Sequence, residues 1–236
     1  MLNRGKALIL LAAVLGCLGT AVALRELFDT DPLGTRAVAR AAVPHGCASP
    51  AAEALARRRL RSGIARYRIE SGGSVIHTDL QQIAHDAALT GALRAGDMRA
   101  ALAAANGELV RHVVQIRVLH GSHVLLDANP SSFDVAGSSI ALRSRDGRAL
   151  GRLQITVQDI IGFIKLERKI DHTRVLVRSS NGLLRTSLPG ATALAMPDSG
   201  CVRVGRRTYV VSSFGERGYK GESLRIWLLT PAQPVA

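Results

Sequence analysis

The two halves of the chain differ in the spacing of their apolar residues. Before residue 109, apolar positions recur every three or four residues, which is the period of an amphipathic helix. Ala56, Leu60, Ile64 and Tyr67 share one such face, and arginines occupy the other faces. Three helices are predicted, one between Ser49-Pro50 and Gly72-Gly73, one through Leu80, Ile83, Ala84 and Ala87 with Asp79 near its start, and one from Ala95 to Ala105 before Asn106-Gly107.

After residue 109 the period falls to two, which is typical of strands with one buried face. Val114, Ile116 and Val118 lie on one side of the first such segment, and Gln115 and Arg117 lie on the other. The predicted strands cover residues 110–119, 123–127, 138–145, 148–157, 174–178, 183–187, 203–213 and 224–229.

Two dipeptides, Asp146-Gly147 and Asn181-Gly182, predict tight hairpin turns between neighbouring strands. One helix interrupts the strands between Asp159 and Ile170, with Asp159 as its N-cap. Its predicted buried face consists of Ile160, Phe163, Ile164 and Glu167. The order of elements predicts an α+β domain, with N-terminal helices packed on one face of an antiparallel sheet.

The amino terminus predicts export from the cytoplasm. Arg4 and Lys6 precede an uncharged, mostly apolar run at residues 7–24, and Arg25 and Glu26 end it. Three alternatives stay open: an uncleaved anchor oriented N-in and C-out, a signal peptide cleaved near residues 21–23, and a lipoprotein lipidated at Cys17. Each of them places the rest of the chain outside the cytoplasm. Since no later stretch is as long and apolar, we expect no second span and no cytoplasmic output domain.

Export changes the interpretation of the cysteines. Cys47 and Cys201 remain after residue 24, an even pair in an oxidising compartment. We predict a disulfide between them, and the alternatives are two buried thiols or pairing between molecules.

The charge and the aromatic content limit the partners. The chain has 31 Lys and Arg against 18 Asp and Glu, a net charge of +13, and only 3% of its residues are aromatic. Few aromatic residues argue against a nucleic-acid binder that stacks bases. The basic excess indicates either a solvated surface or a surface that meets anionic lipids or cell-wall polymers.

The strand region resembles an extracytoplasmic single Cache sensor domain, a relative of the PAS fold. The residues that carry the resemblance are the runs 113–118, 123–127, 142–159 and 162–166, the pair Asn181-Gly182, and the run 205–212. The predicted organisation is a signal peptide or membrane anchor at 1–24, a linker at 25–50, a helical segment at 51–108, a Cache-like domain at 109–230 and a tail at 231–236.

The resemblance implies a small-molecule pocket on the sheet face away from the long helices, and it names no ligand. Cache domains are usually followed by a second span and an output domain, which we do not expect here. Signalling would then pass through a partner protein that spans the membrane.

Polar residues on neighbouring strands are the candidate ligand-binding residues. They are Gln115, Arg117, Arg143, Arg152, Gln154, Thr156 and Arg174. A guanidinium group binds carboxylate or phosphate through paired hydrogen bonds, which favours a small anionic metabolite. The alternative is the solvated side of an antiparallel sheet, which alternates in the same way.

Motifs of catalysis and metal binding are missing from the sequence. We find no Gly-x-Ser-x-Gly elbow, no Ser-x-x-Lys, no His-Glu-x-x-His and no phosphate-binding glycine loop. His112, His120 and His123 do not have the spacing of metal ligands. We therefore expect no cofactor and no enzyme activity. Separately, Trp227 lies in an apolar strand segment, so we expect it in the core.

The sequence predicts a non-catalytic, extracytoplasmic ligand-sensing module. One alternative is a structural or adhesive envelope protein that binds anionic polymers through an arginine-rich surface. Another is an exported hydrolase whose site lacks a recognised motif.

Overall fold

A computed structural model describes residues 48–109, 112–130, 133–193 and 195–232. The predictions for the export segment, for Cys17 and for Cys47 lie outside the described residues. Within the described ranges, no helix has both the length and the hydrophobicity that crossing a bilayer requires.

Four helices follow one another from residue 50 onward. They are α2 (Pro50–Gly72), α3 (Ser74–Ala84), α4 (Ala87–Ala95) and α5 (Met98–Glu108). The Oγ of Ser49 accepts a hydrogen bond from the Ala52 amide at 3.3 Å, which caps α2 as predicted. The helix ends at Gly72, and Tyr67 and Leu60 lie on its buried face. These features of α2 are confirmed.

The prediction of one helix through Leu80 and Ala87 is wrong, because the chain forms α3 and α4 there. A carboxylate oxygen of Asp86 accepts a hydrogen bond from the Leu89 amide at 2.6 Å, and this cap starts a new helix. The predicted stop at Asn106-Gly107 is also wrong, since α5 continues through both residues to Glu108.

In the described part of the chain, the strands form two antiparallel sheets, whereas the sequence predicted one. The four-stranded sheet has the order β2-β1-β4-β3 and the five-stranded sheet the order β6-β5-β9-β8-β7. The first consists of β1 (Gln115–His120), β2 (His123–Ala128), β3 (Ser138–Arg143) and β4 (Ala149–Thr156). The second consists of β5 (Arg174–Ser179), β6 (Leu184–Thr186), β7 (Ser199–Val204), β8 (Arg207–Arg217) and β9 (Ser223–Pro231).

The predicted strand at 203–213 is two strands, β7 and β8, joined by a turn at Gly205, which has φ +59°. Two other connections agree with the prediction. β3 and β4 form the hairpin around Gly147, and β5 and β6 form the hairpin around Gly182. Between β6 and β7 the chain forms a short 3-10 helix, η1 (Ala191–Ala193).

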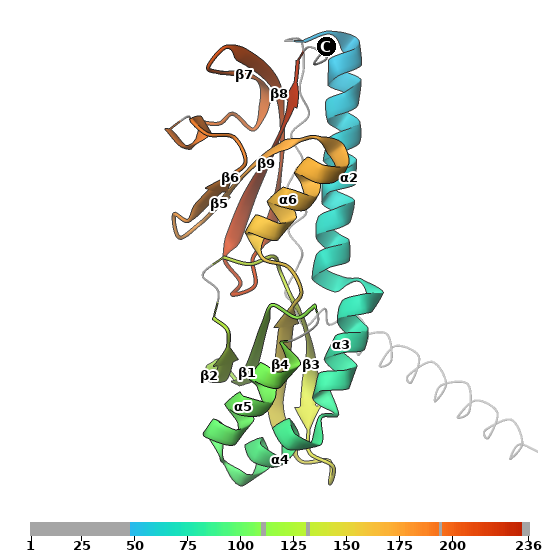
Figure 1. The fold of residues 1–236 in the computed structure, drawn as a ribbon, viewed down its shortest axis with the longest axis vertical. Helices are drawn as coiled ribbons and strands as arrows, with labels where there is room; N and C mark the ends of the chain where they lie inside the picture. The colour runs from blue at the N-terminus through green and yellow to red at the C-terminus, as the bar shows by residue number, and fades with distance from the viewer. Residues whose placement is uncertain (1–47, 110–111, 131–132, 194, 233–236) are drawn as a thin grey trace, which may run out of the picture. The chain divides into compact units, whose positions relative to one another are not determined.

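Each sheet packs against its own helices (Figure 1). The helices α3, α4 and α5 contribute Ile76, Leu89 and Ala101, respectively, to a core shared with Ile116 and Leu153 of the four-stranded sheet. On the five-stranded sheet, α2 packs together with α6 (Ile160–Asp171). The opposite face of this sheet buries a second cluster that contains Trp227, which confirms its predicted place in the core.

The α+β class with N-terminal helices and antiparallel strands is confirmed.

Candidate functional site

Polar residues gather on one face of the four-stranded sheet. In the β1–β4 register, Gln115 lies opposite Thr156 and Arg117 lies opposite Gln154. Neighbouring residues such as Ile116 belong to the core with α3, so these polar side chains point to the other face. The structure thus brings together four of the predicted site residues, on the face away from α3–α5. We call this surface the β1–β4 face.

Asp127 completes the charge pattern of the β1–β4 face, and sequence reasoning missed it. It lies on β2 opposite Arg117. The Nε2 of Gln115 donates a hydrogen bond to Asp127 Oδ1, and Arg117 Nε lies 3.4 Å from Asp127 Oδ2 as an ion pair. The charge complementarity of these two strands across the Gly121 turn was the signal that could have identified it.

The β1–β4 face is covered by Tyr219, which lies in the turn between β8 and β9. The Tyr219 hydroxyl donates a hydrogen bond to the Gln154 carbonyl oxygen at 2.8 Å. In return, Gln154 Nε2 donates to the Tyr219 carbonyl oxygen at 2.9 Å. The Arg117 guanidinium carbon lies 5.7 Å from the centre of the Tyr219 ring, within the range of a cation–π contact.

Tyr219 thus covers part of the sheet face on which the resemblance implies a small-molecule pocket. Tyr219 is only 2% exposed, and burial raises the pKa of its hydroxyl. The phenol therefore stays protonated near neutral pH and can keep donating to Gln154.

The polar groups of the β1–β4 face are buried or partly buried. Gln115 and Thr156 are fully buried, and the Arg117 side chain is 14% exposed. The Thr156 hydroxyl donates to the Val135 carbonyl oxygen at 3.1 Å. Gln115 Oε1 has no hydrogen-bond partner among the residues described. Buried acceptors of this kind are usually satisfied, so the β1–β4 face has the capacity to bind one more donor.

The remaining predicted residues lie apart from this cluster. Arg152 belongs to the same face but is exposed, opposite Leu119. Arg143 is exposed and donates to the Gly147 carbonyl oxygen at 3.0 Å. Arg174 lies on β5 of the other sheet and donates to the Ser187 carbonyl oxygen at 3.3 Å, so its predicted place on a strand next to the other candidates is wrong.

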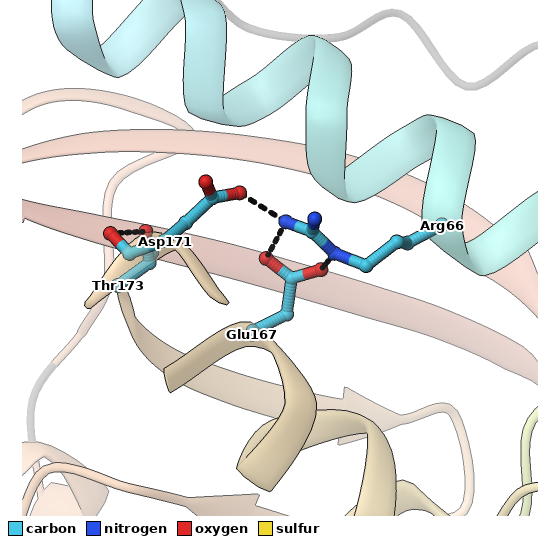
Figure 2. Close-up of polar contacts among 4 residues, drawn as sticks. All are labelled: Arg66, Glu167, Asp171 and Thr173. Carbon is cyan, nitrogen blue, oxygen red and sulfur yellow. Dashed lines mark hydrogen bonds and ion pairs between the residues drawn. The ribbon is translucent and has the colours of Figure 1, made fainter. Parts of the chain in front are cut away.

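A second polar cluster joins α2 to α6 (Figure 2). The guanidinium of Arg66 donates to both oxygens of Glu167, from Nε to Oε1 at 2.6 Å and from Nη2 to Oε2 at 3.1 Å. It also donates to Asp171, whose carbonyl oxygen accepts from the Thr173 hydroxyl at 3.3 Å. The Glu167 side chain has no exposed surface.

Burial dominates the electrostatics of this second cluster. It raises the pKa of the Glu167 carboxyl, although the bonds from Arg66 oppose the shift. The bond to Glu167 raises the pKa of Arg66. The sequence placed Glu167 on the buried face of α6, but its partner is 101 positions away along the chain.

The histidines considered as metal ligands do not form part of a metal-ligand cluster in the described residues. His120 and His123 pair at the end of the β1–β2 hairpin. Among the residues with described positions, no group of three or more His, Cys, Asp or Glu side chains is placed to hold a metal ion.

Cys201 lies half-buried on β7, opposite Val210. Ala52, Ala56 and Val210 form a small apolar cluster, and both Cys201 and Ala48 pack against it. Because Cys47 lies outside the described residues, its disulfide with Cys201 stays a prediction.

Comparisons with known proteins give weak similarities only. No family model and no curated protein matches the chain. One similar structure is the extracellular domain of the putative histidine kinase vpHK1S-Z8, with 12% sequence identity and a TM-score of 0.45. The alignment covers 81% of this chain and 100% of that domain. The ligand-binding domain of the Pseudomonas fluorescens chemoreceptor CtaA, solved with L-alanine, is 11% identical with a TM-score of 0.39, covering 75% of this chain and 97% of that one. Because both similarities are weak, we argue function from this chain's own residues.

Proposed function

We propose that this chain is an extracytoplasmic ligand-sensing module that binds a small metabolite on the β1–β4 face and acts by binding, without catalysis. The observation that carries the proposal is the cluster of Arg117, Gln115 and Asp127, in which Gln115 is fully buried and the Tyr219 ring lies against Arg117. A guanidinium, an amide and a carboxylate on one sheet face are the groups that recognise a small polar molecule.

Burial argues against the alternative that this face is merely the solvated side of a sheet. Gln115 and Thr156 have no exposed surface, and Tyr219 is 2% exposed. Burying polar groups opposes folding unless every one is paired, and an apolar filling would avoid the penalty. A cluster that keeps an unpaired amide oxygen is better explained by binding than by stability.

The charges of the cluster favour a ligand that carries a carboxylate. Arg117 can bind a carboxylate through two parallel hydrogen bonds, which its 3.4 Å ion pair with Asp127 does not supply. Such a ligand would compete with Asp127 for the guanidinium. A donor or a positive group on the same ligand would then balance Asp127 and Gln115 Oε1, so both anionic and zwitterionic metabolites fit.

The proposed location and partner come from the amino terminus. A basic start followed by a long apolar run supports export, with either an N-terminal anchor or release. A sensor held outside the membrane needs a membrane-spanning protein to carry its signal inward. We include such a partner in the proposal.

A thermal-shift screen of the full chain against small carboxylates and amines tests the function. A ligand that binds only the folded state stabilises it by about 2.7 kcal/mol at a concentration of 100 Kd. We expect Arg117→Ala and Gln154→Ala to abolish the shift caused by any hit. Arg174→Ala is the matched control, because it removes the same chemical group from the other sheet and should keep the shift.

Two results would contradict the proposal. In the first, no compound of the screen stabilises the chain. In the second, a hit keeps its affinity in Arg117→Ala and Gln154→Ala, which would place its site elsewhere.

A further inference from the structure

The end of β8 and the turn that follows it contact the long helix α2 and the β1–β4 face, respectively. Tyr219 covers Arg117 and exchanges two hydrogen bonds with Gln154. Two residues earlier, the Arg217 carbonyl oxygen accepts a hydrogen bond from the Tyr67 hydroxyl of α2 at 2.5 Å. One short segment therefore connects the proposed ligand site to α2.

The turn that carries Tyr219 is braced by its own backbone hydrogen bonds. The Gly218 amide donates to the Glu222 carbonyl oxygen at 2.8 Å, and the Gly221 amide donates to the Gly218 carbonyl oxygen at 3.0 Å. Gly221 has φ +88°, a left-handed conformation that favours glycine. These bonds brace the turn that links Tyr219 to Arg217.

The Tyr219 ring has no room to move inward. A Cβ atom added to Gly137 would lie 2.8 Å from two carbons of the ring and 2.0 Å from the Ile155 carbonyl oxygen. Glycine at position 137 is thus what lets the ring lie so close to the sheet. A ligand that takes the guanidinium of Arg117 must push the ring outward.

The α2 end of the connection is equally constrained. Tyr67 is 1% exposed, and its ring makes edge contacts with Phe163 at 5.5 Å and Phe214 at 6.3 Å between centroids. Its hydroxyl also accepts a hydrogen bond from the Ala136 amide at 3.1 Å. If Arg217 moves away, this buried donor loses its acceptor, which favours a movement of α2 that restores the bond.

We infer that residues 218–222 form a displaceable cover of the β1–β4 face, and that opening of the cover is passed to α2 through the hydrogen bond between Arg217 and Tyr67. The inference rests on the proposed function only for the identity of what opens the cover. The coupling itself is a property of the chain alone.

Hydrogen–deuterium exchange of the full chain, without ligand, tests the coupling. Tyr219→Ala removes the ring and the bond to Gln154, so we expect faster exchange at amides 218–222. We also expect exchange to rise by roughly five- to tenfold at the Ala136 amide and in residues 62–72 of α2, the factor that loss of one or two buried hydrogen bonds brings.

Tyr209→Ala is the matched control. Tyr209 is, like Tyr219, a buried tyrosine and is 3% exposed. It lies on β8 and packs in the cluster on the face of the five-stranded sheet opposite α2. It should destabilise the domain without selectively speeding exchange at Ala136 and residues 62–72. Tyr219→Phe, which removes only the hydroxyl, should give a smaller change in the same amides and serves if Tyr219→Ala does not fold.

The outcomes separate the two claims. Faster exchange in 218–222 with unchanged exchange at Ala136 and in α2 would overturn the coupling and leave the proposed function standing. If Tyr219→Ala selectively speeds exchange in α2 while the thermal-shift screen finds no stabilising metabolite, the coupling is supported and the proposed function is contradicted. If Tyr209→Ala reproduces the pattern, the effect is general destabilisation and the inference is wrong.

Discussion

Arg66 of α2 and Glu167 of α6 form a two-pronged ion pair in which the carboxylate is fully buried, with N–O distances of 2.6 and 3.1 Å (Figure 2). The pair joins α2 to α6, the helix that lies between β4 and β5 along the chain. Because Glu167 has no exposed surface, its charge depends on Arg66 for compensation.

Arg66→Met should therefore destabilise the domain strongly. Removing one partner of a buried pair leaves an uncompensated charge, which typically costs about 3–5 kcal/mol. Denaturant unfolding measures the loss. Arg57→Met is the matched control on the same helix, because Arg57 is 39% exposed and lies 3.8 Å from Glu53, and an exposed pair of this kind contributes less than about 1 kcal/mol. Equal losses in the two variants would show that Glu167 does not need Arg66.

The pH dependence of stability should carry the signature of Glu167. Burial raises the pKa of its carboxyl above the usual 4.5, so the folded state holds this proton to a higher pH than the unfolded state does. Stability from this group is fully present below pH 4.5 and is lost as pH rises through the folded pKa. The free energy of unfolding of Glu167→Gln, relative to the native chain, should thus rise as pH increases above 4.5. A difference that stays constant between pH 4 and pH 8 would contradict a raised pKa.

Two glycines on helices should respond to alanine in opposite ways. A Cβ atom at Gly91 of α4 meets nothing within 4 Å, so Gly91→Ala should stabilise by about 1 kcal/mol through helix propensity. At Gly63 of α2 the Cβ atom would lie 2.8 Å from Leu228 Cδ1, in a packed core, and 3.6 Å from Glu167 Oε2. Overpacking costs about 1–3 kcal/mol, so Gly63→Ala should be neutral or destabilising. The same gain at both positions in thermal unfolding would show that the core next to Gly63 adapts easily.

We expect a disulfide between Cys47 and Cys201, because the proposed export would place both cysteines in an oxidising compartment. Ala48, which follows Cys47 in the sequence, packs on the same cluster of Ala52, Ala56 and Val210 as Cys201 does. Closing so long a loop stabilises by about 5 kcal/mol on the chain-entropy model. Peptide mass mapping under non-reducing conditions should find the linked pair. Free thiols at both positions would refute the bond. Cys201→Ser should lower the melting temperature only if the disulfide exists.

Local signals in the sequence predicted many of the elements. The N-cap Asp159 accepts a hydrogen bond from the Gly162 amide at 2.5 Å and starts α6 where the sequence placed it. The glycine-containing turns at Asp146-Gly147 and Asn181-Gly182 form the two predicted hairpins. Such signals act over a few residues, so one sequence is enough to identify them. The Asp86 cap that divides α3 from α4 is equally local, and the longer hydrophobic pattern concealed it.

The candidate site could be predicted only in part. The register of β1 and β4 placed Arg117 opposite Gln154, as alternation and a shared sheet implied. Arg174 was misplaced because alternation does not show which sheet a strand joins. Tyr219 was missed because its contact with Gln154 spans 65 positions in the chain.

By itself, the sequence determined the α+β class, the faces of the helices and the hairpins, because periodicity and turn chemistry depend on near neighbours. Only the tertiary structure decided that the strands divide into two sheets, that Tyr219 covers Arg117 and that Arg66 meets Glu167. These contacts join segments that are far apart in the chain. Which of them form depends on the packing of the whole domain, because each strand edge and each charge has several partners that are equally compatible with the local pattern.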